Sequence, residues 1–186
     1  SVIDAIRDLK ARGLKVTLYP FVMMDIPAGN ALANPYGGAS QPTYPWRGEI
    51  TCHPAAGQAG SVDKTAAAGT QVSAFFGSAA AGQFSSSGDV ISFSGGAQWS
   101  YRRFVLHYAK LAQAAGGVDG FLIGSELRAV TRIRSGAEDF PAVAALVSLA
   151  GEARVIIGAT PKLTYGADWS EYFGYHPADA SGDVFF

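Results

Sequence analysis

The sequence has little of several residue types on which common protein chemistries depend. Its 186 residues include one cysteine, Cys52, so no disulfide can form within the chain. The three histidines have no cysteine neighbours at the spacing of a zinc site. No glycine-rich phosphate-binding motif follows an apolar segment. We therefore expect neither a metal nor a cofactor, and a nucleotide-dependent enzyme has little support.

An excess of charge of either sign is also missing, because 14 Lys and Arg stand against 15 Asp and Glu. Nucleic acids and anionic membrane surfaces are usually bound through surplus Lys and Arg, so we expect no direct nucleic-acid partner. Residues 1–13 carry charges at helical intervals and resemble neither a signal peptide nor a membrane span. Membrane insertion is therefore not expected, and a neutral substrate or a protein is the better supported partner.

Helical and strand patterns alternate along the chain. Apolar residues at helical spacing predict helices within residues 2–12, 97–117 and 139–154. Apolar runs rich in β-branched and aromatic residues predict buried strands within residues 14–27, 118–126 and 162–169, with a further strand starting at 182–186. This order is typical of parallel βα units, in an open sheet or a (β/α)₈ barrel. Because the phosphate motifs are absent, we favour the barrel.

A long segment, residues 28–97, interrupts this alternation after the first predicted strand. It is rich in Gly, Ala, Ser and Pro and far exceeds the ~2 to 6 residues of a usual βα loop, which indicates an insertion. Within it, residues 61–77 predict a helix and residues 88–96 a short strand or hairpin arm. A full barrel typically needs ~250 residues. We therefore expect residues 1–186 to form one α/β domain, a partial or complete TIM-barrel-like domain from a larger protein.

Carboxylates follow three of the predicted strands. Asp25, Glu126 and Asp168 each stand just after an apolar run. The carboxyl ends of barrel strands meet at one mouth, where catalytic groups of such folds lie. We therefore expect these three acids to face the same mouth, with the insertion bordering it.

Aromatic residues accompany these acids. Sugar rings have apolar faces and a fringe of hydroxyls, so aromatic rings beside carboxylates and arginine suit a carbohydrate site, and glycoside hydrolysis needs paired acids. Glu126 is our candidate proton donor. The candidate substrate-binding residues are Asp25, Tyr19, Trp46, Arg128, Tyr165, Asp168 and Trp169.

Each candidate also has a structural interpretation. Glu126 can form an ion pair with Arg128 or Arg132. Asp25, just before Ile26 and Pro27, suits a turn, and Asp168 suits a cap of the segment that starts at Trp169. Trp46 can serve as loop packing. The sequence leaves these alternatives open.

Long stretches of the chain resemble a known family. They are IRDLKARGLKVTLYPFVMMDIP, YPWRGEITCHP, SVDKTAAA, VDGFLIGSELRAVTR and LTYGADWSEYFGYHPADASGDVFF. They are similar to the glycoside-hydrolase-like barrel domain of the large tail-tip, or host-specificity, protein of gene transfer agents and related phage tails. The resemblance implies a protein that is assembled in the bacterial cytoplasm with other tail or baseplate proteins and is then extracellular in a phage-like tail, facing cell-surface carbohydrate.

The same resemblance bears on Glu126. Barrel glycosidases that retain configuration usually carry Asn-Glu at this strand end, whereas this chain has Ser125 and Glu126. The later strand that carries the nucleophile in the family is not in this sequence. We therefore expect polysaccharide recognition, leave cleavage to experiment, and expect this chain alone to be inactive. The alternative is a free-standing glycoside hydrolase acting on an envelope or capsular glycan.

Overall fold

The computed structural model describes residues 1–172 and 174–176. Internal contacts divide the chain into two compact units, and each is made of several separate stretches of sequence. Unit 1 comprises Ser1–Pro20, Phe75–Gly124 and Leu146–Gly166. Unit 2 comprises Phe21–Ala74, Ser125–Ala145 and Ala167–Phe186.

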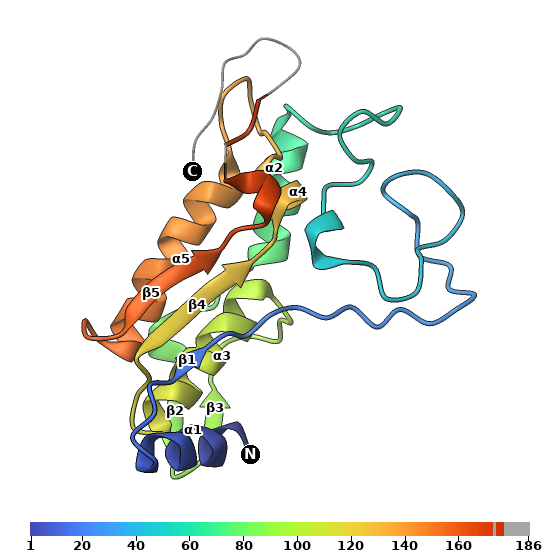
Figure 1. Cartoon of the computed structure of the whole chain (residues 1–186). Helices are drawn as coiled ribbons and strands as arrows, with labels where there is room; N and C mark the ends of the chain where they lie inside the picture. Colours follow the sequence, from blue (N-terminus) through green and yellow to red (C-terminus); the bar gives the residue numbers. More distant parts are fainter. Residues whose placement is uncertain (173, 177–186) are drawn as a thin grey trace. The chain divides into compact units, whose positions relative to one another are not determined.

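Unit 1 is built on a three-stranded sheet in the order β1-β4-β5. Its strands are β1 (Thr17–Leu18), β4 (Gly120–Ser125) and β5 (Lys162–Gly166). β1 and β4 are parallel, with Thr17 opposite Gly120, and β5 runs in the same direction as β4 (Figure 1). β4 is buried along almost its whole length, as its apolar run predicts.

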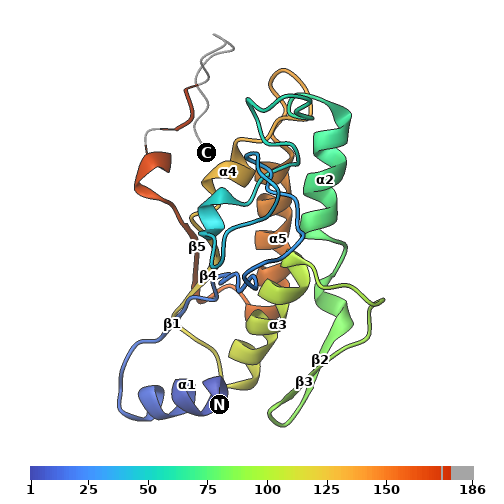
Figure 2. The ribbon, with the colours of Figure 1, turned by 90° about the vertical axis from the view of Figure 1, so that its right-hand side faces the viewer.

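Helices cover one face of this sheet. They are α3 (Tyr101–Ala114) and α5 (Pro141–Ile157), of which the last begins in unit 2, while α1 (Val2–Ala11) packs against α3. Figures 1 and 2 both show α3 and α5 on the same side of the strands. Ser1 caps α1 and forms a capping box with Asp4, and Ser100 caps α3. All three helices lie where the sequence predicts them.

Gly124 allows α3, β4 and β5 to meet closely. The Tyr101 hydroxyl donates a hydrogen bond to the Ile123 carbonyl at 3.0 Å. A Cβ on Gly124 would lie 2.6 Å from that hydroxyl and 3.2 Å from the Tyr165 ring. The end of β4 therefore needs a residue without a side chain.

A hairpin completes unit 1. Its strands β2 (Phe84–Ser87) and β3 (Val90–Phe93) are antiparallel, and β3 lies within residues 88–96, where the sequence predicts a short strand or hairpin arm. The helix predicted within residues 61–77 is α2 (Ala66–Phe76), which ends in unit 1.

Unit 2 consists mainly of irregular backbone joined by short helices. They are η1 (Arg47–Glu49), α4 (Arg128–Thr131) and η3 (Trp169–Glu171), together with the start of α5 and most of α2. Because few backbone groups here pair in strands, side chains accept hydrogen bonds from the backbone amides instead. Asn30 Oδ1 accepts from the amides of Leu32 and Gln41, and Asp63 Oδ1 accepts from the Arg134 amide at 2.8 Å.

The structure corrects the first predicted strand. Within residues 14–27 only Thr17–Leu18 is extended in the sheet. Pro20 has no N–H to donate to a ladder, and Phe21, Met23 and Asp25 are exposed rather than buried. The prediction that Asp25 directly follows a strand is therefore wrong.

The described residues form three parallel strands and no complete barrel. The segment 182–186, predicted to start another strand, lies outside the described residues. Within the described ranges, no helix combines the length and the apolar composition that crossing a membrane requires.

Candidate functional site

Glu126 stands directly after β4 in an unusual backbone conformation. Its φ is 52°, in the left-handed region that glycine favours. Such a conformation costs a non-glycine residue about 1 to 2 kcal/mol. Strained residues of this kind concentrate at functional sites, which distinguishes Glu126 from its neighbours in unit 2.

Arg47 and Trp46 hold the Glu126 carboxylate. Arg47 Nη2 lies 2.5 Å from Oε2, and Trp46 Nε1 donates to the same oxygen at 3.1 Å. Arg47 also donates to the Ser125 hydroxyl at 3.2 Å. The side chains of Arg47 and Glu126 are 17% and 32% exposed. The carboxylate is therefore fixed yet open to solvent, and Oε1 receives no hydrogen bond from the described residues.

The Trp46 ring is packed on two sides. The Arg128 guanidinium lies over it, 5.2 Å from the ring centroid. The outer edge of the ring approaches Gly48, where a Cβ would come within 2.4 Å. Trp46 therefore positions Glu126, and the part that it can offer to a sugar ring is limited.

Other rings near this cluster are more open. The Arg47 guanidinium lies 4.8 Å from the centroid of Phe21, which is exposed. Trp169, the first residue of η3, is 77% exposed. These two rings are better placed than Trp46 to contact a ligand from solvent.

Asp168 acts as the cap of η3. Its side chain accepts hydrogen bonds from the amide and the hydroxyl of Ser170, and Glu171 accepts from the Asp168 amide in return. The Ser170 hydroxyl bond, aided by the positive charge of Arg128, lowers the pKa of Asp168 below its ordinary value. Arg128 Nη1 also donates to Ser170 at 3.4 Å. Arg128 thus connects the Asp168 cap with Trp46.

Three further predicted residues lie elsewhere in the chain. Asp25 is in unit 2 and exposed, and none of the contacts among described residues joins it to Glu126. Tyr19 and Tyr165 belong to unit 1, where Tyr165 packs against Gly124. The structure therefore brings together Glu126, Trp46, Arg128 and Asp168 through a chain of contacts.

Residues 99–186 match the GTA TIM-barrel-like domain. GTA stands for gene transfer agent, so over α3, β4, α5 and β5 this match supports a gene-transfer-agent-type, TIM-barrel-like domain. It includes Glu126 and Asp168 but not Trp46 or Arg47, which lie before the matched residues. A search of the curated proteins finds no match to this chain.

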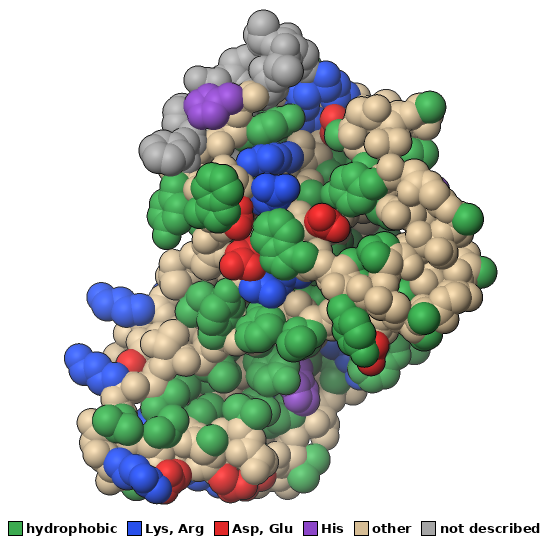
Figure 3. Space-filling model, turned by 45° about the vertical axis from the view of Figure 1, so that its right-hand side comes forward, with side chains coloured by type: hydrophobic (Ala, Val, Ile, Leu, Met, Phe, Trp, Pro, Cys, Tyr) green, Lys and Arg blue, Asp and Glu red, His purple; other side chains and the backbone are tan. Residues whose placement is uncertain are grey.

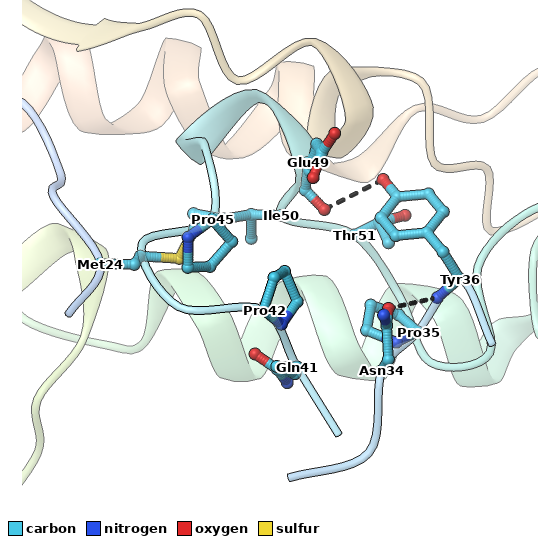
Figure 4. A pocket seen from close by; sticks show the side chains of 10 residues that line it. All are labelled: Met24, Asn34, Pro35, Tyr36, Gln41, Pro42, Pro45, Glu49, Ile50 and Thr51. Carbon is cyan, nitrogen blue, oxygen red and sulfur yellow. Dashed lines mark hydrogen bonds between the residues drawn. The ribbon is translucent and has the colours of Figure 1, made fainter. Parts of the chain in front are cut away.

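The short helix η1, which contains Arg47, also borders a pocket. The pocket has a volume of about 330 Å³, near the lower end of the ~300 to 1,000 Å³ usual for small-molecule sites. Figure 4 shows proline rings and Tyr36 around it, and the Tyr36 hydroxyl donates to the Glu49 carbonyl at 3.0 Å. Burial, with the charge of Glu49, raises the pKa of Tyr36. The lining residues are Met24, Asn34, Pro35, Tyr36, Gln41, Pro42, Pro45, Glu49, Ile50 and Thr51.

These groups suit the binding of hydroxyl-rich ligands. The carboxylate of Glu126 can accept hydrogen bonds from ligand hydroxyls through Oε1. Arg47 and Trp46 can only donate hydrogen bonds, so neither can act as a base toward Glu126. Acidic, basic and hydrophobic side chains lie next to one another on the face in Figure 3. Among the described residues no three His, Cys, Asp or Glu side chains form a cluster that could hold a metal ion.

Sequence reasoning missed Arg47 as the partner of Glu126. We considered Arg128 and Arg132, which are close in sequence, whereas the structure pairs Glu126 with an arginine 79 residues away. The motif YPWRGE offered one signal, because it places an arginine beside the candidate residue Trp46.

Proposed function

We propose that this chain is part of a gene-transfer-agent-related tail protein whose barrel-like domain binds polysaccharide of the recipient cell envelope at Glu126. The observation that carries the proposal is the fixed carboxylate, with Oε2 held by Arg47 and Trp46 and Oε1 facing no described donor. The match of residues 99–186 to the GTA TIM-barrel-like domain supports the biological setting.

In this proposal the sugar hydroxyls bond to Glu126, and the exposed rings of Phe21 and Trp169 pack against apolar sugar faces. The pocket beside η1 accepts a neighbouring sugar unit. The protein is assembled in the cytoplasm with tail or baseplate partners and acts outside the cell, in the tail. The family match does not favour a free-standing hydrolase.

The test is binding of the chain to neutral envelope polysaccharides, measured by affinity electrophoresis. Glu126→Gln replaces an acceptor-only carboxylate by an amide of similar shape, and we expect it to weaken binding by about tenfold. Glu138→Gln is the matched control, because it makes the same change at an exposed residue of unit 2 that has no described contact with Glu126. Equal loss in both variants, or none in either, would contradict the proposal.

A further inference from the structure

Unit 1 carries a second group of aromatic and basic side chains at its surface. Trp99 precedes Ser100, the cap of α3, and its side chain is 94% exposed. Single exposed hydrophobic residues are common. Trp99 differs from these because the guanidinium of a neighbouring arginine lies over its ring.

Arg103 lies between two aromatic rings. Its guanidinium carbon is 4.1 Å from the centroid of Trp99 and 4.6 Å from that of Phe93. Nη1 donates to the Gln98 carbonyl at 2.5 Å. Cation–π contacts on two sides and this hydrogen bond limit the rotamers of Arg103, so the cation is pre-organised.

The hairpin fixes the inner ring of this group. Phe93 packs on Phe84 with ring centroids 4.9 Å apart. Gly95 lies so close to Phe93 that a Cβ there would fall 2.2 Å from the ring. We call Phe93, Trp99 and Arg103 the Trp99 platform.

Most hydrogen-bond donors of the Trp99 platform have no acceptor among the described residues. Arg103 forms no ion pair with any described residue, whereas Arg7 pairs with Asp89 and Arg102 with Glu152. Trp99 Nε1 likewise has no hydrogen-bond partner within the described part of the chain. A guanidinium that is held in place without an acidic partner complements a carboxylate, which it can bind through two parallel hydrogen bonds.

We propose that the Trp99 platform binds an acidic polysaccharide. One sugar ring packs on the exposed indole, and the carboxylate of the same or an adjacent uronic acid residue pairs with Arg103. A single arginine on a chain of net charge −1 would bind a nucleic-acid backbone only weakly. The proposal does not depend on the function proposed for Glu126, which lies in the other unit.

The experiment measures retardation of the full chain by polygalacturonate and by neutral dextran. We expect Trp99→Ala and Arg103→Gln each to weaken polygalacturonate binding about tenfold. Lys15→Gln removes the same charge from an exposed residue of unit 1, and Val155→Ala trims another exposed side chain there; both should bind like the parent chain. Added salt should weaken the parent's binding.

A second measurement follows Trp99 alone. The chain has three tryptophans, so Trp46→Phe combined with Trp169→Phe leaves Trp99 as the only indole. Its emission should shift with polygalacturonate and stay constant with dextran. Glu126→Gln should leave acidic binding intact, which separates this proposal from the neutral-glycan site. Unchanged binding in both platform variants, or stronger binding to single-stranded nucleic acid than to polygalacturonate, would overturn it.

Discussion

Arg47 and Glu126, 79 residues apart in sequence, form an ion pair with Nη2 and Oε2 2.5 Å apart. Trp46 donates to the same oxygen. The pair therefore ties the loop segment before α2 to the end of β4, and it fixes the carboxylate on which the proposed function rests.

The first prediction is an energetic coupling between these two residues. A double-mutant cycle with Arg47→Gln and Glu126→Gln should give about 1 kcal/mol, since the pair is half-buried and shares Oε2 with Trp46. Urea unfolding of the four proteins measures it. The control cycle uses Arg132→Gln, because Arg132 bonds to the Ser170 carbonyl instead. A coupling as large for Arg132 as for Arg47 would contradict the pairing.

The second prediction concerns the left-handed backbone at Glu126. Both Glu126→Gly and Glu126→Ala remove the carboxylate, so their difference in stability reports mainly on the backbone conformation. With φ at 52°, the glycine variant should be more stable than the alanine variant by about 1 kcal/mol. Chemical denaturation of the two variants checks this, and equal stability would mean that this conformation is not kept in solution.

The third prediction concerns the packing of the Trp46 ring against Gly48. Gly48→Ala places a Cβ about 2.4 Å from the indole ring, so the ring must move and its hydrogen bond to Glu126 should be lost. We expect a change in tryptophan emission and a loss of about 1 to 3 kcal/mol in the free energy of unfolding. Gly82→Ala is the matched control, because a Cβ there meets nothing within 4 Å. Similar behaviour of both variants would count against the packing described.

The helices and β4 could be predicted from sequence because their signals are local. Ser1 and Ser100 cap helices whose apolar residues recur at helical spacing, and the run Gly120–Ser125 is apolar on both faces. The strand predicted within residues 14–27 was too long, because aromatic and β-branched residues continue beyond Leu18. Pro20 interrupts the hydrogen bonding that a strand needs.

The candidate site was predictable only in part, for a related reason. Glu126 and Asp168 were found by their positions after apolar runs, and the cap interpretation of Asp168 is confirmed. The Arg47 pair joins residues far apart in sequence through irregular backbone, for which no periodicity exists. The catalytic and substrate-binding roles stay predictions.

The fourth prediction is a pH dependence at Asp168. Its pKa in the folded chain is below the ordinary value of 3.8, so the ionised carboxylate favours folding. This contribution is present above pH 4 and is lost as the pH falls through the lowered pKa. Asp168→Asn can still cap η3 but cannot ionise. The parent should therefore unfold at higher urea than the variant near pH 6, and the gap should narrow as the pH falls below about 4. A gap that widens on acidification would contradict the sign.

The last prediction is that this chain binds glycan without hydrolysing it. Retaining hydrolysis needs two carboxyl groups about 5 to 5.5 Å apart and inverting hydrolysis about 6.5 to 9.5 Å. Asp168 is already engaged as a cap, and Asp25 has no described contact with Glu126. A lone general acid contributes ~10² to 10⁴ in rate, far below what a glycosidic bond requires. Reducing-sugar release from envelope polysaccharide should therefore be the same for the parent and for Glu126→Gln. Clear release that disappears in the variant would instead favour the free-standing hydrolase.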